Sequence, residues 1–465
     1  METNTFRISH FHYCGDGMAQ SPEGRMFRIA NALAGELVEA EPCPIRRRAQ
    51  AYLTRVLTPS ADRVEPPCPL WQSCPACQFA CLSIDAQRAL KKAHWLRLIQ
   101  KFVQIPEDCQ TDFVCAPQTL AYRHRTDLTI FQTQKGRVTG ILPRTDIAAI
   151  QFAHAGPGID LKEATAQDLY DAPAVRPLDM QHCALHAPEL AQLIARFCAL
   201  DLPFAHLTRI GFEAYGNQAR IIVYNMPDQN MPDQAHGSKQ LAAQAGQTLD
   251  VSVIFQELPP RGSHVYPKPE TLAGSPYYGY AHDDEDHLLY ALRGAWTPVN
   301  PGNAALIRKA LAEMTETRHF ENILELGCGC GTHASVMKRC AHAYTGIDAS
   351  WPAILSAQHN AQTYNWQNAA FFTDTAEHYL DKRYYKGCRA DAILMHSNRM
   401  PYSEKTAELC KRFGARTLYI VAPTAYAVAQ ECRHFTALGY RLTRLTLCDT
   451  LPMTYHMMAV ASLEL

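Results

Sequence analysis

The chain has 465 residues, of which 47% are hydrophobic and 19% are charged, and its formal net charge is −1. This length suits two to four domains with sizeable cores, and the near-neutral charge excludes binding of nucleic acid through a high overall positive charge. The sequence contains no apolar run of about 18 residues and no apolar signal segment at its start. We therefore expect no membrane contact and a cytoplasmic location. In that compartment the 17 cysteines do not indicate a disulfide framework.

Residues 1–62 are predicted to form a small β-barrel. The stretch CGDGMAQSPEGRMFRIANALAGELVEA contains short alternating strands, with tight turns at Asp16-Gly17 and Glu23-Gly24. Two basic segments, residues 46–48 and residues 88–101, are candidate RNA contacts, and solvated surface charge is the alternative interpretation. Any RNA binding must come from such local patches.

A proline-rich loop at the start of the next region, residues 63–290, carries Cys68, Cys74 and Cys77. A fourth ligand could be Cys183, which is distant in the sequence, or Cys81, which is close. Four thiolates suit an iron–sulfur cluster or zinc, whereas unligated buried cysteines are the alternative.

The rest of this region is predicted to be mixed α and β structure. Apolar residues recur on one face from residue 84 to residue 104, which indicates a helix. The stretches AYRHRTDLTIF, ARIIVYNM and DVSVIFQEL are typical of strands.

Residues 291–465 alternate between predicted strands and helices, which indicates a parallel α/β sheet. An apolar strand at residues 322–326 leads into ILELGCGCGTHASVM, where Glu325, Gly327, Gly329 and Gly331 have the spacing E-x-G-x-G-x-G. Asp348 ends the next strand, where a carboxylate can bind the ribose hydroxyls of a nucleoside cofactor. The leading acid and the lack of G-x-G-x-x-G spacing favour S-adenosylmethionine (SAM) over NAD.

Together these features resemble the RNA uracil-5-methyltransferases over nearly the whole chain. The resemblance implies a TRAM domain (an OB-like RNA-binding barrel) at 1–62, a central α+β iron–sulfur domain at 63–290, and a Rossmann-like SAM-methyltransferase domain at 291–465. It also implies the site residues. A [4Fe-4S] cluster would be held by Cys68, Cys74, Cys77 and Cys183, and SAM would be bound by Glu325, Gly327, Gly329, Gly331, Asp348 and Asp374.

The family's chemistry requires a cysteine nucleophile. Its thiolate adds to C6 of uracil, the activated C5 attacks the SAM methyl group, and a carboxylate then removes the C5 proton. The family's Ser-Cys-Asn-Pro turn matches residues 421–424, where Ala422, or Val421 if the prolines are aligned, replaces the cysteine. The family's base follows an Asp-x-x-Pro-x-x-x-His run, and here Met458 occupies its position.

Two further family motifs are altered. The Asp-Pro-Pro-Arg loop becomes residues 396–399, His-Ser-Asn-Arg, in which only Arg399 is kept. The Phe-x-Gln-x-Asn motif becomes residues 296–300, with Pro298 in place of the glutamine. Cys432 and Cys448 are alternative nucleophiles, but neither lies at the expected turn, so buried core thiols are the preferred interpretation.

Three functions remain open. The preferred one is a catalytically inactive paralogue that binds structured RNA (rRNA or tRNA) and SAM, for instance in ribosome assembly or beside an active paralogue. The second is a repurposed RNA methyltransferase that acts on nitrogen or oxygen, which needs no covalent adduct. The third is a uracil methyltransferase with a displaced cysteine.

Overall fold

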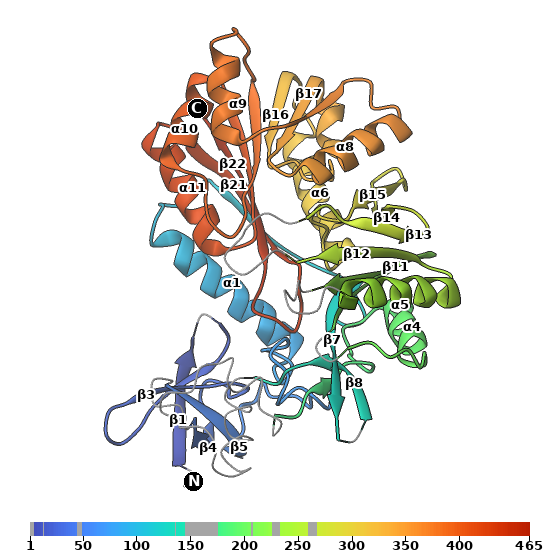
Figure 1. Ribbon diagram of the computed structural model, residues 1–465. Helices are drawn as coiled ribbons and strands as arrows, with labels where there is room; N and C mark the ends of the chain where they lie inside the picture. The colour runs from blue at the N-terminus through green and yellow to red at the C-terminus, as the bar shows by residue number, and fades with distance from the viewer. Residues whose placement is uncertain are drawn as a thin grey trace.

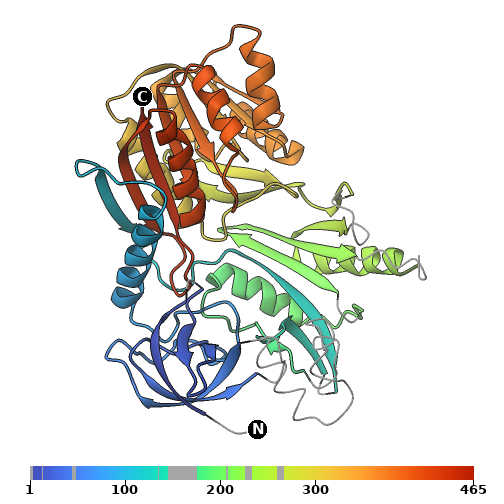
Figure 2. The same ribbon diagram turned by 90° about the vertical axis from the view of Figure 1, so that its left-hand side faces the viewer.

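The computed structural model describes the chain except for residues 1–3, 13, 44–48, 135, 145–174, 206–207, 226–232 and 259–266. The basic segment at 46–48 lies outside the described residues. Among the residues that are described, no helix is long and apolar enough to cross a membrane. The small N-terminal barrel lies at one end of the molecule and the C-terminal sheet at the other (Figure 1, Figure 2).

The N-terminal barrel is closed, as the sequence predicts. Inward-facing apolar side chains, including Phe6, Ile8, Phe27 and Val38, fill its interior, because alternate residues of a strand point to the same face. In the closed order β1-β2-β3-β5-β4, the strands are β1 (Asn4–Phe11), β2 (Gly17–Gln20), β3 (Met26–Ile29), β4 (Leu37–Pro42) and β5 (Gln50–Thr58).

A long helix, α1 (Ile84–Gln100), follows the cysteine-rich loop and packs against the C-terminal part of the chain. Ser83 caps its first turn by accepting a hydrogen bond from the backbone N–H of Ala86 at 3.4 Å. The helix ends four residues earlier than the periodicity predicts, because the chain turns there toward the strand β6 (Gln110–Cys115).

A mixed seven-stranded sheet forms most of the central region. Its strands, in the order β13-β12-β11-β10-β7-β8-β9, are β7 (Arg125–Thr133), β8 (Gly136–Ile141), β9 (Leu178–Asp179), β10 (Arg209–Tyr215), β11 (Gln218–Asn225), β12 (Ser252–Glu257) and β13 (Glu270–Ala273). The helices α4 (Pro188–Cys198) and α5 (Asp233–Leu249) share one apolar core with this sheet. A two-stranded sheet follows, made of β14 (Tyr277–His282) and β15 (Leu288–Leu292).

The C-terminal region is built on an eight-stranded sheet in the order β18-β17-β16-β19-β20-β22-β21-β6. Its strands are β16 (Phe320–Leu326), β17 (Ala341–Asp348), β18 (Ala369–Thr373), β19 (Ala392–His396), β20 (Thr417–Ala422), β21 (Arg441–Asp449) and β22 (Met458–Glu464). The helices are α6 (Pro301–Thr315), α7 (Ala334–Met337), α8 (Trp351–Thr363), α9 (Ala376–Tyr384), α10 (Glu404–Arg412) and α11 (Ala425–Ala437), with a 3₁₀ turn at Lys338–Cys340.

The strands β18, β17, β16, β19 and β20 are mutually parallel, and β22 runs antiparallel to both of its neighbours. Every residue of β20 is buried, as is typical of a strand covered on both faces. The edge strand β6 comes from the central part of the sequence and pairs in parallel with β21. The domain boundaries at 62/63 and 290/291 stay predictions. The strand β6 belongs to the predicted central domain by sequence, but it is part of the C-terminal sheet.

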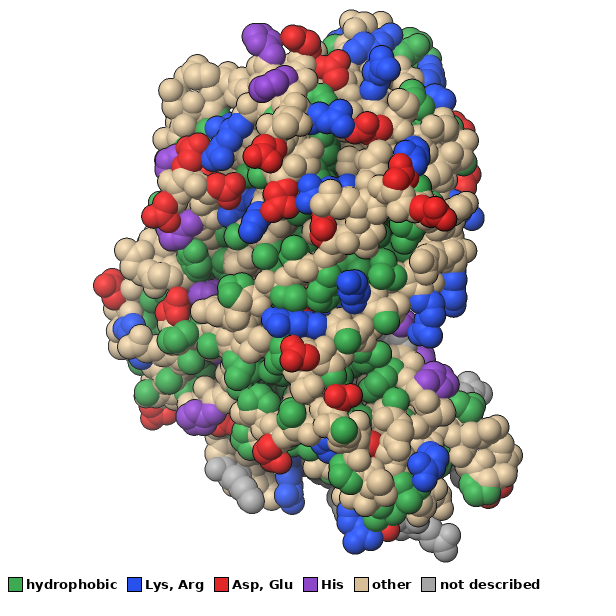
Figure 3. Space-filling model, turned by 180° about the vertical axis from the view of Figure 1, so that it is seen from behind, with side chains coloured by type: hydrophobic (Ala, Val, Ile, Leu, Met, Phe, Trp, Pro, Cys, Tyr) green, Lys and Arg blue, Asp and Glu red, His purple; other side chains and the backbone are tan. Residues whose placement is uncertain are grey.

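Charges of both signs are intermixed on the surface. On the face shown in Figure 3, lysines and arginines alternate with aspartates and glutamates, and no broad field of one sign is visible. This mixture agrees with the net charge of −1, so an anionic partner would be bound by local groups of cations.

Candidate functional site

The glycine loop follows β16 at the carboxyl edge of the parallel strands, where α/β proteins bind ligands. Gly327, Gly329 and Gly331 have φ values of +77°, +55° and +78°, which side chains with a Cβ adopt only with strain. A Cβ at Gly327 would lie 2.7 Å from the carbonyl oxygen of His396. Glycine is thus required both for the turn and for the close approach of the 396–402 loop.

Asp348 and Asp374, two of the residues expected to bind SAM, lie next to each other at the ends of β17 and β18. The carboxylate of Asp348 accepts hydrogen bonds from the backbone N–H groups of Gly329 at 3.0 Å and Ser350 at 2.8 Å. Burial raises the pKa of Asp348, and these two hydrogen bonds oppose that rise. The backbone N–H of Asp374 donates to the Asp348 carbonyl at 3.1 Å, so the two acids share one edge of the sheet with the glycine loop.

Glu325, the third expected SAM contact, is fully buried and faces other side chains of the protein. Its carboxylate accepts hydrogen bonds from Nδ1 of His333 at 2.9 Å and from the hydroxyl of Tyr344. The ring of His333 in turn lies 5.0 Å from the ring of His396, measured between centroids. The structure therefore places a carboxylate and two imidazoles in a row beside the glycine loop.

Sequence reasoning missed His333 and His396 as a pair. Each has a local signal, since His333 follows the glycine loop directly and His396 ends an apolar strand. Their proximity depends on the pairing of β16 with β19, which no local pattern specifies.

The end of β20, where the resemblance predicts a nucleophile position, is buried and apolar. Ala422 ends β20 and has no exposed surface, and the carbonyl of Val421 accepts a hydrogen bond from the N–H of Ser397 at 3.0 Å. Thr424 caps α11 by accepting from the N–H of Ala427 at 3.1 Å. The strand end thus passes directly into a helix, and its side chains offer no thiol.

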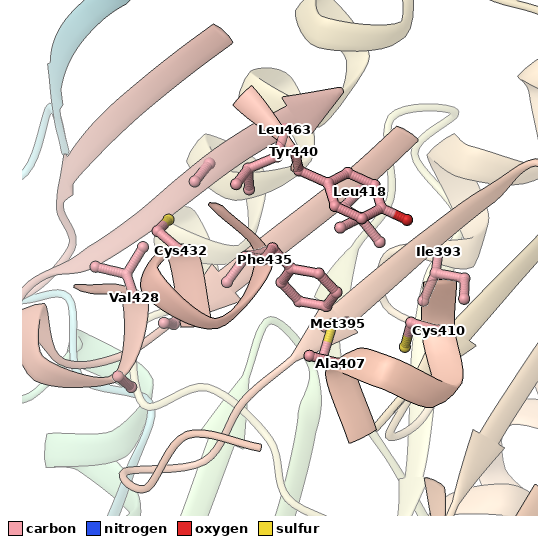
Figure 4. Close-up of a cluster of buried hydrophobic side chains, with 14 of the residues drawn as sticks. Ile393, Met395, Ala407, Cys410, Leu418, Val428, Cys432, Phe435, Tyr440 and Leu463 are labelled. Atoms are coloured by element: carbon pink, nitrogen blue, oxygen red, sulfur yellow. The ribbon is translucent and has the colours of Figure 1, made fainter. Parts of the chain in front are cut away.

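The two alternative cysteines lie in apolar cores. Cys432 packs among Val428, Phe435 and other side chains between α11 and the sheet (Figure 4), and Cys448 lies in the core on the other face. Burial raises the pKa of both thiols well above the usual range, which disfavours the thiolate that a nucleophile requires.

The segment where the resemblance predicts a base position lies beside a buried ion pair. Met458 begins β22, and the carboxylate of Asp449 accepts a hydrogen bond from Nζ of Lys91 at 2.6 Å. Lys91 also donates to the carbonyls of Leu451 at 3.0 Å and His456 at 3.4 Å. One lysine of α1 therefore holds the loop that precedes Met458.

A second buried acid lies under the 396–402 loop and was also missed by sequence reasoning. Oε1 of Glu431, on α11, accepts hydrogen bonds from the hydroxyl of Ser397 at 2.6 Å and from the N–H of Tyr402 at 3.0 Å. Its Oε2 has no hydrogen-bond partner among the described residues. Burial raises the pKa of Glu431 to about 7.

The four cysteines of the expected cluster line one largely apolar cavity, together with Arg123, Leu185 and Met453. Cys81, the local alternative to Cys183, is absent from this lining, and its Sγ lies 3.5 Å from the carbonyl oxygen of Asn31. No group of three or more His, Cys, Asp or Glu side chains in the described part of the chain is placed to hold a metal ion. The cavity therefore brings the four thiols together, but not at the spacing of ligands to a single ion.

Comparison with known proteins identifies a methyltransferase domain and full-length relatives. The family model for a methyltransferase domain matches residues 323–434. The 23S rRNA (uracil(1939)-C(5))-methyltransferase RlmD of Shewanella halifaxensis is 24% identical, over 99% of this chain and 95% of the relative. RlmD of Pectobacterium atrosepticum is also 24% identical, over 98% of this chain and 92% of the relative.

A solved structure has the same overall fold. The tRNA (uracil-54, C5)-methyltransferase of Pyrococcus abyssi, in complex with S-adenosyl-L-homocysteine, superposes with a TM-score of 0.67 at 16% identity. The match covers 99% of this chain and all of the other. It confirms the predicted combination of a small closed barrel and a methyltransferase-like α/β region.

Proposed function

From the full-length relationship of this chain to the RNA uracil-5-methyltransferases, we propose that it binds structured RNA and SAM but does not methylate C5 of uracil. The proposed RNA is rRNA or tRNA, the substrates named for the relatives. A role in ribosome assembly, alone or beside an active paralogue, is compatible with such binding. The cytoplasmic location expected from the sequence stays a prediction.

The observation that carries the loss of uracil chemistry is the end of β20 at Ala422. C5 of uracil becomes nucleophilic only after a thiolate has added to C6, and Ala422 offers only a methyl group, with no exposed surface. Cys432 and Cys448 are buried with raised pKa values. A shift of even about 1 Å in a reacting group costs around 10²-fold in rate, so neither thiol could replace the missing one from within a core.

A methyl-transfer assay tests this proposal. Anaerobically purified protein is incubated with labelled SAM and total RNA from cells that lack its gene, and the nucleosides are identified by mass spectrometry. A uracil-5-methyltransferase that keeps its cysteine serves as the positive control, and SAM binding is measured separately by calorimetry. We expect SAM binding and no labelled 5-methyluridine. Labelled 5-methyluridine that disappears in Cys432→Ala or Cys448→Ala would contradict the proposal and identify a displaced nucleophile.

SAM binding is supported by the methyltransferase-domain match and by the geometry at the carboxyl edge of the sheet. We propose that Asp348 binds the ribose hydroxyls, that Asp374 lies beside the adenine, and that the glycine loop contacts the rest of the cofactor. Glu325 would act indirectly, because both of its oxygens accept hydrogen bonds from protein side chains. When bound, SAM would supply an electrophilic methyl group.

We further propose that Cys68, Cys74, Cys77 and Cys183 hold a [4Fe-4S] cluster. Support comes from their shared cavity. Burial raises the pKa values of Cys74, Cys77 and Cys183, so these thiols stay protonated when no metal is bound. Such thiols become thiolates when a positive charge lies next to them, as iron supplies. A cluster binds each thiolate to a different iron atom, so its four ligands lie farther apart than the ligands of one ion.

A further inference from the structure

A row of three ionisable side chains beside the glycine loop is not used by the function proposed so far. Glu325 lies in β16, His333 follows the glycine loop, and His396 ends β19. Because a Cβ on Gly327 would lie only 2.7 Å from the His396 carbonyl oxygen, His396 adjoins the loop proposed to hold SAM. We propose that His396, positioned by His333 and Glu325, accepts the proton from a nucleobase nitrogen that takes the methyl group of SAM.

The inner part of this row is fixed. Glu325 has no exposed surface and His333 is 5% exposed. The carboxylate of Glu325 accepts hydrogen bonds from Nδ1 of His333 at 2.9 Å and from the hydroxyl of Tyr344. With its Nδ1–H donating to a carboxylate, His333 keeps Nε2 as an acceptor. The carboxylate therefore fixes the ring of His333, which lies next to the ring of His396.

His396, at the outer end of the row, is less buried than Glu325 and His333. His396 is partly exposed, and among the described residues neither of its ring nitrogens has a hydrogen-bond partner. Its ring lies 5.0 Å from that of His333 and 6.0 Å from that of Trp296, between centroids. Burial, with His333 as a second cause, lowers the pKa of His396 to about 3, so the imidazole is neutral at physiological pH and has a lone pair available. Only a strongly acidic group, such as a methylated and positively charged base nitrogen, can protonate it.

The exposed Trp296 indicates the class of acceptor. Trp296 is 59% exposed. The plane of its ring is nearly perpendicular to that of His396, at 88°. Large exposed aromatic rings provide stacking surfaces for unpaired bases, at about 1–3 kcal/mol per base. A base stacked on Trp296 would present its edge to His396 and to the cofactor loop.

The chemistry balances without a covalent adduct. The lone pair of the base nitrogen attacks the methyl carbon, the C–S bond breaks, and SAM leaves as S-adenosylhomocysteine. The methylated nitrogen carries a positive charge and loses its proton to His396, which releases that proton to water. A nitrogen acceptor therefore requires neither the cysteine nor the C5 base that Ala422 and Met458 replace.

Glu431 is another buried acid near the 396–402 loop, but its carboxylate does not take part in the row of Glu325, His333 and His396. Its carboxylate accepts hydrogen bonds from Ser397 and the N–H of Tyr402 from beneath the loop, and it is 1% exposed. Glu431 therefore positions the 396–402 loop, whereas His396 is a partly exposed side chain next to the glycine loop.

This inference rests on the SAM site proposed above, and the test separates the two. Total RNA from cells that lack the gene is incubated with labelled SAM and one of three proteins: the wild type, His396→Ala or His342→Ala. The last is the control, because His342 is an exposed histidine at the end of β17 away from Asp348. We expect a nucleoside methylated on a base nitrogen, with the rate lowered about 10²-fold in His396→Ala, partly restored by added imidazole, and unchanged in His342→Ala.

Three results would overturn the inference. If SAM binds but no methyl group is transferred, the inference fails and the proposed SAM- and RNA-binding function stands. If the product is 5-methyluridine, both fail. If a base nitrogen is methylated equally fast by His396→Ala, the reaction is real but His396 is not its proton acceptor. SAM affinity measured by calorimetry on each variant ensures that a slow variant is one that still binds the cofactor.

Discussion

At the scale of single residues, the buried acid Glu431 fixes the 396–402 loop through hydrogen bonds. Glu431 accepts two hydrogen bonds from the loop through one oxygen, while its other oxygen has no partner in the described structure. A carboxylate with an unpartnered buried oxygen is more stable when protonated, which is why its pKa rises to about 7.

We predict that Glu431→Gln removes a pH dependence of stability. The pKa of Glu431 is about 7 when folded, against 4.5 for an ordinary glutamate, so its stabilising effect is complete below about pH 4.5 and is lost as the pH rises through about 7. The full change is on the order of 3 kcal/mol. Urea unfolding at pH 5 and pH 8 measures it. The exposed Glu404→Gln should behave as the wild type, and an equal pH dependence in Glu431→Gln would contradict the prediction.

The glycines of the cofactor loop differ in why they are needed. Gly327 has both a positive φ and a backbone oxygen in the space of a Cβ, whereas Gly329 has a positive φ and nothing within 4 Å of an added Cβ. We expect Gly329→Ala to lower the unfolding free energy by about 1–2 kcal/mol for the backbone conformation alone. Gly327→Ala should cost clearly more, because the 396–402 loop must move. If urea unfolding gives the same loss of unfolding free energy for both variants, the 396–402 loop can move away from residue 327 at no cost.

At the scale of elements, the cysteine loop and the segment before α4 meet at one cavity. Cys68, Cys74 and Cys77 come from the loop that precedes α1, and Cys183 comes from the turn that precedes α4. A cluster there would join two segments that are more than 100 residues apart in the sequence, and this constrains the unfolded chain much as a covalent link does.

We predict that anaerobically purified wild-type protein is brown, with broad absorbance near roughly 400 nm and about four iron atoms per chain. Cys74→Ser and Cys183→Ser should lose the colour and most of the iron, because each removes one ligand. Cys81→Ser is the matched control, since Cys81 is buried, as Cys74 is, but is absent from the cavity lining. Colourless wild-type protein that carries one zinc, or loss of colour in Cys81→Ser alone, would overturn the assignment.

At the scale of the whole molecule, the central part of the chain is built into the C-terminal sheet. The strand β6 supplies the edge of that sheet and α1 packs against α11. Between them, the buried pair of Lys91 and Asp449 ties α1 to the end of β21, with side chains 1% and 2% exposed. These contacts predict that the two regions unfold together.

We predict that Lys91→Met lowers the unfolding free energy by about 3–5 kcal/mol, because it leaves the buried carboxylate of Asp449 with only the more distant Arg88, at 3.8 Å. The loop before Met458 also loses its hydrogen bonds to the lysine. The neighbouring Lys92→Met, on the exposed side of the helix, should change stability by less than about 0.5 kcal/mol. Urea unfolding followed by far-UV and near-UV circular dichroism provides the measurement. A loss below about 1 kcal/mol, or two separate transitions in the wild type, would contradict this account.

The sequence by itself determined the features that arise from local patterns. Alternating apolar residues and Gly turns predicted the barrel, and an apolar strand followed by E-x-G-x-G-x-G predicted a tight glycine turn after β16. The absence of a thiol at Ala422 is equally readable, because it needs only a comparison of residues at one strand end. These features depend on contacts within a strand, turn or helix, which short-range periodicity records.

Only the tertiary structure decided which distant side chains meet. His333 and His396 become neighbours because β16 pairs with β19, Lys91 reaches Asp449 across 358 positions, and Glu431 lies under the 396–402 loop because α11 packs against it. Strand order is set by the burial of whole faces of the sheet rather than by any local pattern. For this reason the sequence was enough to propose that the uracil chemistry is lost, whereas the proton acceptor that we propose in its place required the tertiary structure.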